Sequence, residues 1–384
     1  MKIMHTGDWH IGKSFNQVQL TEDQSYVIEQ LIEYIRKERP DVLIIAGDLY
    51  DRSVPPVEAV ELLDRTFSRL RLEHALPVLV IAGNHDSPDR LGFGSRILEV
   101  QGLHIAGRLS LPLSQVTLED QWGPVDFYLL PYAAPGAVRE LLDDAAVRDH
   151  DSAMEALLKR LPKNEEKRRR VLVTHAYVRG AQALEESESE KPLSVGGTDY
   201  VSAAHFQDFS YVALGHLHRP QQAGSERIRY AGSLLKYSFS EVRQPKSLTL
   251  AEIDGEGEVS LKLLPLTPRL EVRKIKGNLQ DLLAAASQEE AGREDYLHVT
   301  LTDDGEVVEP MARLRAAYPN VLALEREVRQ VKEKELQAIA MRQRSKADLF
   351  ADFYRQVVGE ELNEERRQVV DVAVSAVLGK EEGK

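Results

Sequence analysis

Two apolar runs that end in the same way constrain the fold of this chain more than any other feature. Residues 42–46 and 78–82 are continuously apolar, and they are followed by Gly47-Asp48 and by Gly83-Asn84-His85. Such runs are typical of parallel strands that are buried on both faces of a sheet. Apolar residues at helical spacing precede each run, which predicts a β-α-β-α-β chain. The polar residues would then lie at the carboxyl edge of the sheet, where α/β folds bind ligands.

Three further predicted strands also end in side chains that can bind metals. These are Asp8 and His10 after residues 2–6, His175 after residues 171–174, and His216 and His218 after residues 211–214. Each has an ordinary explanation when taken alone, because such residues also occur in polar loops, cores and turns. Five strand ends that all carry ligand-type residues are hard to explain by chance. The pattern therefore favours one shared metal site.

The composition allows a globular protein of roughly two or three domains. The chain has 384 residues and no apolar run of the roughly 18 residues that a membrane span needs. No signal peptide is expected before the first strand. The absence of cysteine excludes thiolate metal sites and fits a cytoplasmic location. The net charge of -13 argues against a protein that coats nucleic acid with a broad basic surface.

The pattern along the chain predicts four segments. We expect a first domain over 1–267, a small domain over 268–328, a charged linker over 329–344, and two amphipathic helices within 345–384. The small domain alternates strand and helix patterns, as β-α-β-α-β.

Within the first domain, alternating stretches predict a second, more antiparallel sheet. They lie around residues 227–231, 247–253 and 259–264. Residues 185–190 are acidic and are expected to form a mobile loop.

The seven strand-end ligands, Asp8, His10, Asp48, Asn84, His175, His216 and His218, offer oxygen and nitrogen but no sulfur. That set suits two divalent first-row metals such as manganese, iron or zinc. One carboxylate must bridge the metals to hold them about 3.5–4 Å apart. A pair at that distance activates a water molecule and stabilises charge on the attacking and leaving oxygens of phosphoryl transfer.

The order of these motifs resembles the calcineurin-like metallophosphoesterase superfamily. The family pattern is Asp-x-His, Gly-Asp-x-x-Asp/His, Gly-Asn-His-Asp/Glu, a lone His and Gly-His-x-His, and all of it occurs between Asp8 and His218. The resemblance implies an α/β fold with a two-sheet sandwich, a small α+β capping domain and a C-terminal two-helix tail. It also implies two sets of metal ligands, namely Asp8, His10, Asp48 and His218 for one metal, and Asp48, Asn84, His175 and His216 for the other.

The same resemblance gives His85 and Asp51 catalytic roles. His85 would contact the scissile phosphate and assist the leaving group, and Asp51 would orient it. A carboxylate behind an imidazole fixes its tautomer and raises its pKa, so that it can donate a proton near neutral pH.

Within the superfamily, the chain resembles the SbcD family. The resemblance rests on residues 47–52 (Gly-Asp-Leu-Tyr-Asp-Arg), residues 83–87 (Gly-Asn-His-Asp-Ser) and the long extension after the last histidine motif. It implies a manganese-dependent nuclease that digests duplex DNA from its ends in the 3′ to 5′ direction and cuts single strands and hairpins, in repair and recombination. It also implies an assembly of two such subunits with two SbcC ATPase chains.

Two surfaces would serve these partners. Lys13, Arg52 and Arg90 lie near the metal motifs and could contact DNA phosphates, although each could also be a solvated charge. The tail helices would dock on the ATPase through an apolar stripe made of Leu349, Phe350, Phe353, Tyr354, Val357, Val370 and Val374. Alternatively, the two helices pack back on the capping domain.

Two other functions remain open from the sequence. A free-standing metallophosphoesterase acting on a small phosphodiester or nucleotide would use the same ligands. A non-catalytic scaffold would be expected to lack some of them, and none is missing here.

Overall fold

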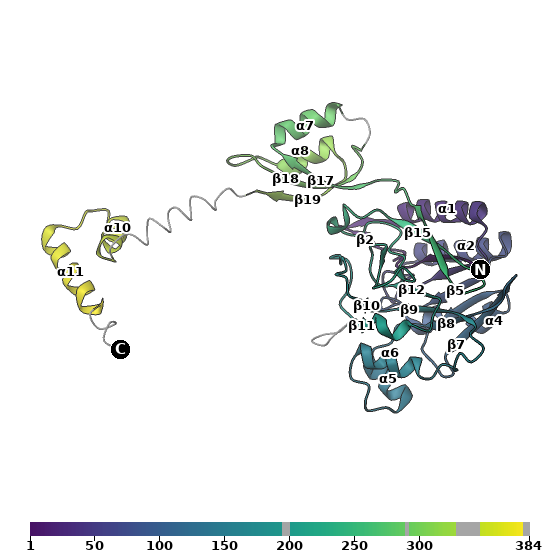
Figure 1. Cartoon of the computed structure of the whole chain (residues 1–384). Helices are drawn as coiled ribbons and strands as arrows, with labels where there is room; N and C mark the ends of the chain where they lie inside the picture. Colours follow the sequence, from purple (N-terminus) through teal and green to yellow (C-terminus); the bar gives the residue numbers. More distant parts are fainter. Residues whose placement is uncertain (194–199, 289–291, 328–345, 379–384) are drawn as a thin grey trace.

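The computed structural model describes residues 1–193, 200–288, 292–327 and 346–378. Two six-stranded sheets dominate the first part of the chain (Figure 1). The first sheet has the order β16-β15-β1-β4-β5-β6. Its strands are β1 (Lys2–Thr6), β4 (Val42–Ile45), β5 (Val78–Ile81), β6 (Leu103–Ala106), β15 (Ser247–Ile253) and β16 (Val259–Pro265).

The second sheet has the order β13-β14-β12-β9-β8-β7. Its strands are β7 (Ser114–Asp120), β8 (Gly123–Leu130), β9 (Arg169–His175), β12 (Tyr211–Gly215), β13 (Gln221–Gln222) and β14 (Ile228–Tyr230). Strands β8, β9, β12 and β14 run parallel, and only the two edge strands are antiparallel. The prediction of a more antiparallel second sheet is therefore wrong.

Strands β15 and β16 also differ from the prediction, because they belong to the first sheet. Strand β15 pairs antiparallel with β1, and β16 pairs antiparallel with β15. Alternating hydrophobicity shows that a strand has two faces, but it does not show which sheet edge the strand joins. Here the chain returns to the free edge of β1 and covers it.

The predicted parallel strands occur in order as β1, β4, β5 and β6. Their continuous apolar runs follow from burial on both faces. In β4, Val42 and Ile44 face the layer between the two sheets, whereas Leu43 and Ile45 face the helices on the outer side. All four side chains are fully buried.

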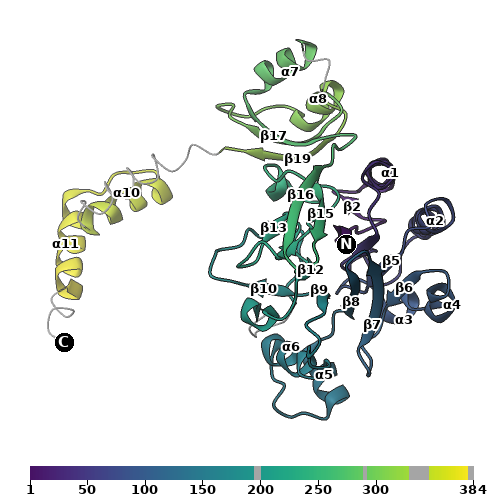
Figure 2. The ribbon, with the colours of Figure 1, turned by 45° about the vertical axis from the view of Figure 1, so that its right-hand side comes forward.

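Helices cover the outer face of each sheet (Figures 1 and 2). Helices α1 (Thr21–Glu38) and α2 (Val57–Ser68) share an apolar cluster with the first sheet, and α5 (Pro135–Leu142) and α6 (His150–Leu158) share one with the second. A π-helical turn over Arg69–Glu73 extends α2, and the short helices α3 (Pro88–Leu91) and α4 (Ser95–Glu99) follow β5. The result is the predicted two-sheet α/β sandwich.

The predicted β-α-β-α-β segment is present after Pro268. It consists of β17 (Val272–Gly277), α7 (Leu279–Gln288), β18 (Tyr296–Leu301), α8 (Pro310–Ala317) and β19 (Val321–Arg326). The three strands form a parallel sheet of their own with an apolar cluster of their own. The domain boundaries proposed from the sequence stay a prediction.

Two helices end the described chain, α10 (Lys346–Val358) and α11 (Glu364–Leu378). Asn363 caps α11, since its Oδ1 accepts a hydrogen bond from the Arg366 amide at 3.0 Å. The predicted linker over 329–344 lies outside the described residues. Within the described residues, none of the helices has the length and apolar character that crossing a membrane requires.

Candidate metal centre

All seven predicted ligands lie at one rim, where the two sheets of the sandwich meet. The loops after β1, β4 and β5 bring in Asp8, His10, Asp48 and Asn84, and the ends of β9 and β12 bring in His175, His216 and His218. Ligand atoms of Asp8, His10 and His218 lie within 4.8 Å of one another, and so do those of Asp8, Asp48 and His175. The strand-end pattern therefore predicted a true spatial cluster.

The backbone at this rim is tight and strained. Asp8, His10 and Asp48 have φ angles of 51°, 46° and 50°, in the left-handed region that non-glycine residues rarely adopt. At Gly215 an added Cβ would lie 1.8 Å from the Ala46 oxygen. Strain of this kind collects at functional sites, where the surrounding structure holds it in place.

The Asp48 carboxylate stands at the middle of the cluster. Its Oδ2 lies 3.5 Å from His175 Nε2, 3.7 Å from His10 Nε2 and 3.9 Å from His85 Nε2. Its Oδ1 accepts a hydrogen bond from the His85 amide at 2.8 Å. Asp48 thus reaches histidines from three different strand ends.

The buried carboxylates of the cluster lack enough positive charge nearby to compensate them. Burial raises the pKa of Asp48 to about 6. Burial, and then the charge of Asp48, raise the pKa of Asp8. Burial lowers the pKa of His175 to about 4 and lowers that of His10 and His216 as well, so these imidazoles are neutral. Two buried carboxylates with neutral imidazoles around them are costly unless a cation compensates them.

The hydrogen bonds show that a cation fits. His175 Nδ1 donates to the Ala46 carbonyl at 2.9 Å, which leaves a lone pair on Nε2. That lone pair faces Asn84 Oδ1 at 2.8 Å, so two acceptors point at each other. His10 Nε2 and His218 Nε2 likewise face each other at 3.1 Å. Nitrogen and oxygen ligands in this arrangement suit divalent first-row metals.

His85 lies beside the cluster, but Asp51 holds it differently from the prediction. His85 Nδ1 donates to the backbone carbonyl of Asp51 at 2.7 Å. The Asp51 carboxylate instead accepts from Lys13 Nζ at 2.7 Å. Burial lowers the pKa of His85, and the nearby Asp48 charge opposes this only partly. The Asp51 carbonyl and the Asp51 charge also raise this pKa, but burial outweighs them and the net shift is downward.

The three predicted DNA-contact residues differ in their environment. Lys13 is mostly buried and paired with Asp51, and its Nζ lies 5.6 Å from the centre of the Tyr237 ring. Arg52 and Arg90 are exposed, on the loop after β4 and on α3. Exposure to solvent therefore separates the two arginines from Lys13.

Two buried polar residues that the sequence did not single out organise the rim. The Asp86 carboxylate accepts backbone hydrogen bonds from Leu49, Tyr50 and Gly83 at 3.0–3.1 Å, which ties the loops after β4 and β5 together. Gln24 on α1 donates to the Trp9 and His10 carbonyls. Asp86 belongs to the Gly-Asn-His-Asp motif, which could have identified it, whereas no motif in the sequence around Gln24 indicated its role.

The acidic segment 185–190 also packs on the centre. The Glu190 carboxylate accepts a hydrogen bond from the His218 amide at 2.7 Å, and Ser189 Oγ lies 2.8 Å from His218 Nδ1. Lys191 Nζ reaches to 3.4 Å from His85 Nδ1. A hollow of about 210 Å³ lies between this segment and His216. Part-buried hydrogen bonds therefore place the segment expected to be a mobile loop against the centre, where it forms one wall of the site.

Comparisons with known proteins agree with this geometry. Residues 1–220 match the family model for the calcineurin-like phosphoesterases. Over their full lengths (100% of each), the chain is 36% identical to a Staphylococcus saprophyticus protein that is named as the SbcD component of the SbcCD nuclease. This chain belongs to the SbcD family of calcineurin-like phosphoesterases. It is accordingly a metal-dependent phosphodiesterase, and its cofactors are divalent metal ions.

Other similarities extend over the rest of the chain. A protein of the same name from Staphylococcus epidermidis is 32% identical and covers 99% of this chain and 100% of that protein. Residues 268–358 match the family model described as type 5 capsule protein repressor C-terminal domain. A solved dimetal phosphatase from Danio rerio overlaps with a TM-score of 0.41 at 12% identity, over 71% of this chain and 97% of that one. That overlap is too low to support an argument.

The close packing at Gly215 gives a first prediction. Gly215→Ala should lower the free energy of unfolding by about 1–3 kcal/mol or more, because its Cβ would overlap the Ala46 oxygen and lie 2.8 Å from His175 Nδ1. It should also weaken Mn²⁺ binding. Chemical denaturation and calorimetric titration measure the two effects.

The matched control is Gly136→Ala on α5, where the nearest atom would lie 3.9 Å away. Alanine in a helix is favoured over glycine by up to about 1 kcal/mol, so this variant should be neutral or slightly stabilised. Equal behaviour of the two variants would contradict the close packing at the rim.

Proposed function

We propose that this chain is the nuclease component of an SbcCD-type complex and hydrolyses DNA phosphodiesters with two manganese ions. The observation that carries the proposal is the central Asp48 carboxylate, which lies between two groups of histidines. The names of the full-length relatives support the substrate and the partner. The proposed reactions are 3′ to 5′ digestion of duplex ends and cleavage of single strands and hairpins.

The two metals would share Asp48. Asp8, His10 and His218 would complete one ligand set, which the 3.1 Å contact between His10 and His218 supports. The second set would consist of Asn84, His175 and His216, and the 2.8 Å contact between Asn84 and His175 supports it. Bound metals would supply an activated water and would stabilise charge on the phosphate.

His85 would act on the leaving oxygen. Its Nδ1–H donates to the Asp51 carbonyl, so Nε2 faces the centre and lies 3.9 Å from Asp48 Oδ2. Binding of an anionic phosphate would favour a second proton on this ring, and the Nε2–H of the resulting imidazolium would then pass to the leaving oxygen during bond cleavage. Asp51 would orient His85 through its backbone, while its carboxylate holds Lys13.

The segment over 268–328 would cap the DNA groove, and Arg52 and Arg90 would meet phosphates. Both arginines are exposed near the rim. Lys13 would act mainly by balancing the charge of Asp51, because their 2.7 Å pair already uses its ammonium.

The nuclease proposal is tested by cleavage of a 3′-labelled duplex and of a DNA hairpin, with Mn²⁺, Mg²⁺ or EDTA. Asp48→Ala should abolish cutting, because it removes the ligand that both metals share. His85→Leu should retain Mn²⁺ binding and lose about 10²- to 10⁴-fold in rate, the usual contribution of a general acid. Unchanged cutting by His85→Leu would remove His85 from the mechanism.

A second candidate function is hydrolysis of a small phosphodiester, and the same assay separates the two. The ATPase partner is added when the isolated protein fails to cut DNA. Continued failure on DNA, with hydrolysis of an aryl phosphodiester intact, would favour the second candidate.

The tail helices would bind the ATPase. Phe353 and Val357 on α10 are 60% and 66% exposed, which is unusual for such apolar side chains. Phe350 is also exposed, whereas Leu349, Tyr354, Val370 and Val374 are half-buried. A hollow of about 430 Å³ lies between the two helices, lined by Phe350, Tyr354 and Val370 among others. These features support docking of a partner against the helix pair.

Substitution on the exposed stripe tests this docking. Phe353→Glu with Val357→Glu should weaken ATPase binding by about 30-fold or more, the loss typical of an interface hot spot. Cutting of single strands by the isolated protein should not change. Glu360→Ala, an exposed polar position beyond α10, is the control. Full ATPase binding by the double variant would contradict the docking site.

Two nuclease chains would pair in the assembly through the apolar side chains near α4. Phe93, Ile97 and Val100 are 85%, 77% and 82% exposed. Val57 and Val60 on α2 are exposed as well, and α2 and α4 lie next to each other along the first sheet (Figures 1 and 2). Several exposed apolar side chains on neighbouring helices are typical of a symmetric dimer contact.

Sedimentation of the 43.2 kDa chain tests the dimer. Wild type should sediment as a dimer, and Phe93→Asp with Ile97→Asp should shift it to monomer, because buried carboxylates oppose the contact. Val308→Asp changes an equally exposed apolar residue outside this surface and should leave the dimer intact. Monomeric wild type would contradict the proposed pairing.

A further inference from the structure

A fully buried carboxylate stands behind His218. Glu241 lies in a 3-10 turn (Phe239–Glu241) and has no exposed surface. Its Oε1 lies 3.1 Å from His218 Nδ1 and also accepts a hydrogen bond from Ser187 Oγ at 3.0 Å. Ser189 Oγ also lies 2.8 Å from His218 Nδ1 and donates a hydrogen bond to the same Glu241 oxygen. The carboxylate thus reaches the ring nitrogen that points away from the proposed metal both directly and through this hydroxyl.

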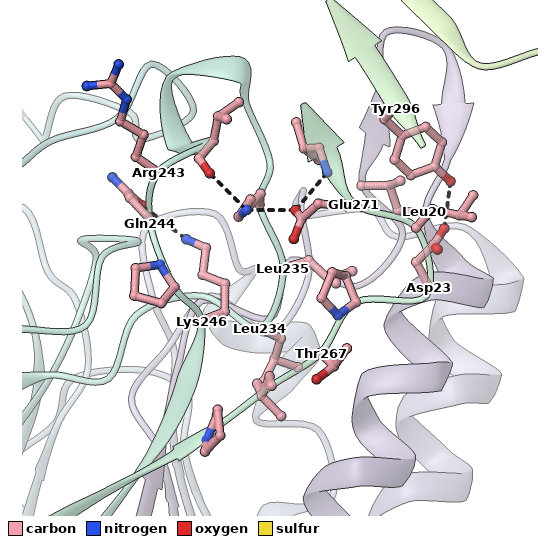
Figure 3. Close-up of a pocket in the computed structure, with 18 residues that line it drawn as sticks. Leu20, Asp23, Leu234, Leu235, Arg243, Gln244, Lys246, Thr267, Glu271 and Tyr296 are labelled. Carbon is pink, nitrogen blue, oxygen red and sulfur yellow. Dashed lines mark hydrogen bonds and ion pairs between the residues drawn. The ribbon is translucent and has the colours of Figure 1, made fainter. Parts of the chain in front are cut away.

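A buried ammonium holds this carboxylate in turn. Lys246 Nζ lies 2.7 Å from Glu241 Oε2 and donates to the His218 carbonyl at 2.7 Å. Lys246 Nζ also donates to Gln244 Oε1 at 3.2 Å. Figure 3 shows the side chains of Lys246 and Gln244 at the wall of a cavity of about 430 Å³. Glu241 therefore contacts the ring of His218, and Lys246 contacts its backbone carbonyl.

The burial of this pair is hard to explain by stability alone. Two charges inside a protein cost several kcal/mol each in lost hydration, and apolar residues of similar size are often as stable. A buried pair of this kind is easier to explain when one of its charges changes the properties of a neighbouring functional group. Here the neighbour is a ring that faces His10 across 3.1 Å.

Within the described residues, the outer nitrogen of His175 at the proposed second metal makes no hydrogen bond to a carboxylate, because Asp8 Oδ1 lies 4.0 Å from its Nδ1. There Nδ1 donates to the Ala46 carbonyl, which is neutral. A carboxylate on the outer nitrogen makes an imidazole a stronger ligand than a carbonyl does, and it fixes the tautomer more firmly. The two proposed metal positions therefore differ in the charge that stands behind their histidines.

We propose that Glu241 is a positioning residue, which holds the proton of His218 on Nδ1 and makes the metal position of Asp8, His10 and His218 the tighter of the two. This inference rests on the ligand sets of the proposed function. Lys246 keeps the carboxylate in place, and Ser187 joins the loop wall of the site to the same group.

The test is titration of the full-length protein with Mn²⁺, followed by calorimetry and electron paramagnetic resonance. Wild type should bind two ions with different affinities. Glu241→Gln should weaken the tighter one by about 10- to 100-fold, the usual effect of removing an outer partner, and should leave the weaker one unchanged. Equal affinities in wild type, or an unchanged tighter site in Glu241→Gln, would overturn the inference.

Two further variants keep the result interpretable. Glu241→Gln with Lys246→Met removes both charges, so that no unpaired charge is left buried, and it should weaken the same site. Glu155→Gln changes an acid that pairs with Lys159 on α6, which covers the outer face of the second sheet, and it should leave both sites unchanged.

A spectroscopic readout separates positioning from general stability. In the metal-free protein, the ring nitrogen signals of His218, assigned with His218→Gln, should show a proton on Nδ1. The double variant should shift toward a mixture of tautomers while it melts cooperatively. An unchanged tautomer would overturn the positioning role.

Failure of the proposed function gives a different pattern. Two unequal Mn²⁺ sites that respond to Glu241→Gln, without DNA cleavage in the presence of the ATPase, would uphold the inference and contradict the nuclease. Cleavage of DNA with an unresponsive tighter site would do the opposite.

Discussion

The structure depends on two carboxylates, Asp8 and Asp48, buried side by side among neutral imidazoles. Burial raises the pKa of both, and the charge of Asp48 adds to the effect on Asp8. The free-energy cost of burying these carboxylates falls at the rim where two sheets converge. The same two residues also have left-handed backbone conformations, which add strain. Divalent cations would remove the cost, so metal binding and the stability of the rim are linked.

The backbone does most of the orienting at this site. The amides of His85 and His216 donate to Asp48 and Asp8, and the carbonyls of Ala46 and Asp51 accept from His175 and His85. Backbone groups on the ends of packed strands move little, so side chains bound to them keep their geometry. The ring of His218 is held differently, because the partners of its Nδ1 are the side chains of Ser189 and Glu241.

Much of this could be predicted from local pattern. Apolar runs closed by glycine located the strands, and the polar residues behind them located the rim. The pairing of β15 with β1 could not be predicted, because alternation does not specify a partner strand. The role of the Asp51 carbonyl was also missed, since a sequence displays side chains and not the hydrogen bonds of its backbone.

The sequence by itself determined which side chains able to bind a metal follow the strands, and at which strand ends they lie. Strand periodicity and glycine breaks are local, and the parallel order of the strands brings their carboxyl ends to one edge. Only the tertiary structure decided which groups form hydrogen bonds with those side chains and with their backbone. Glu241, Lys246 and Gln24 reach the centre from distant parts of the chain, and the acidic segment 185–190 packs on it through part-buried hydrogen bonds. Such contacts depend on how the sheets and loops pack in space, and local sequence patterns do not predict that packing.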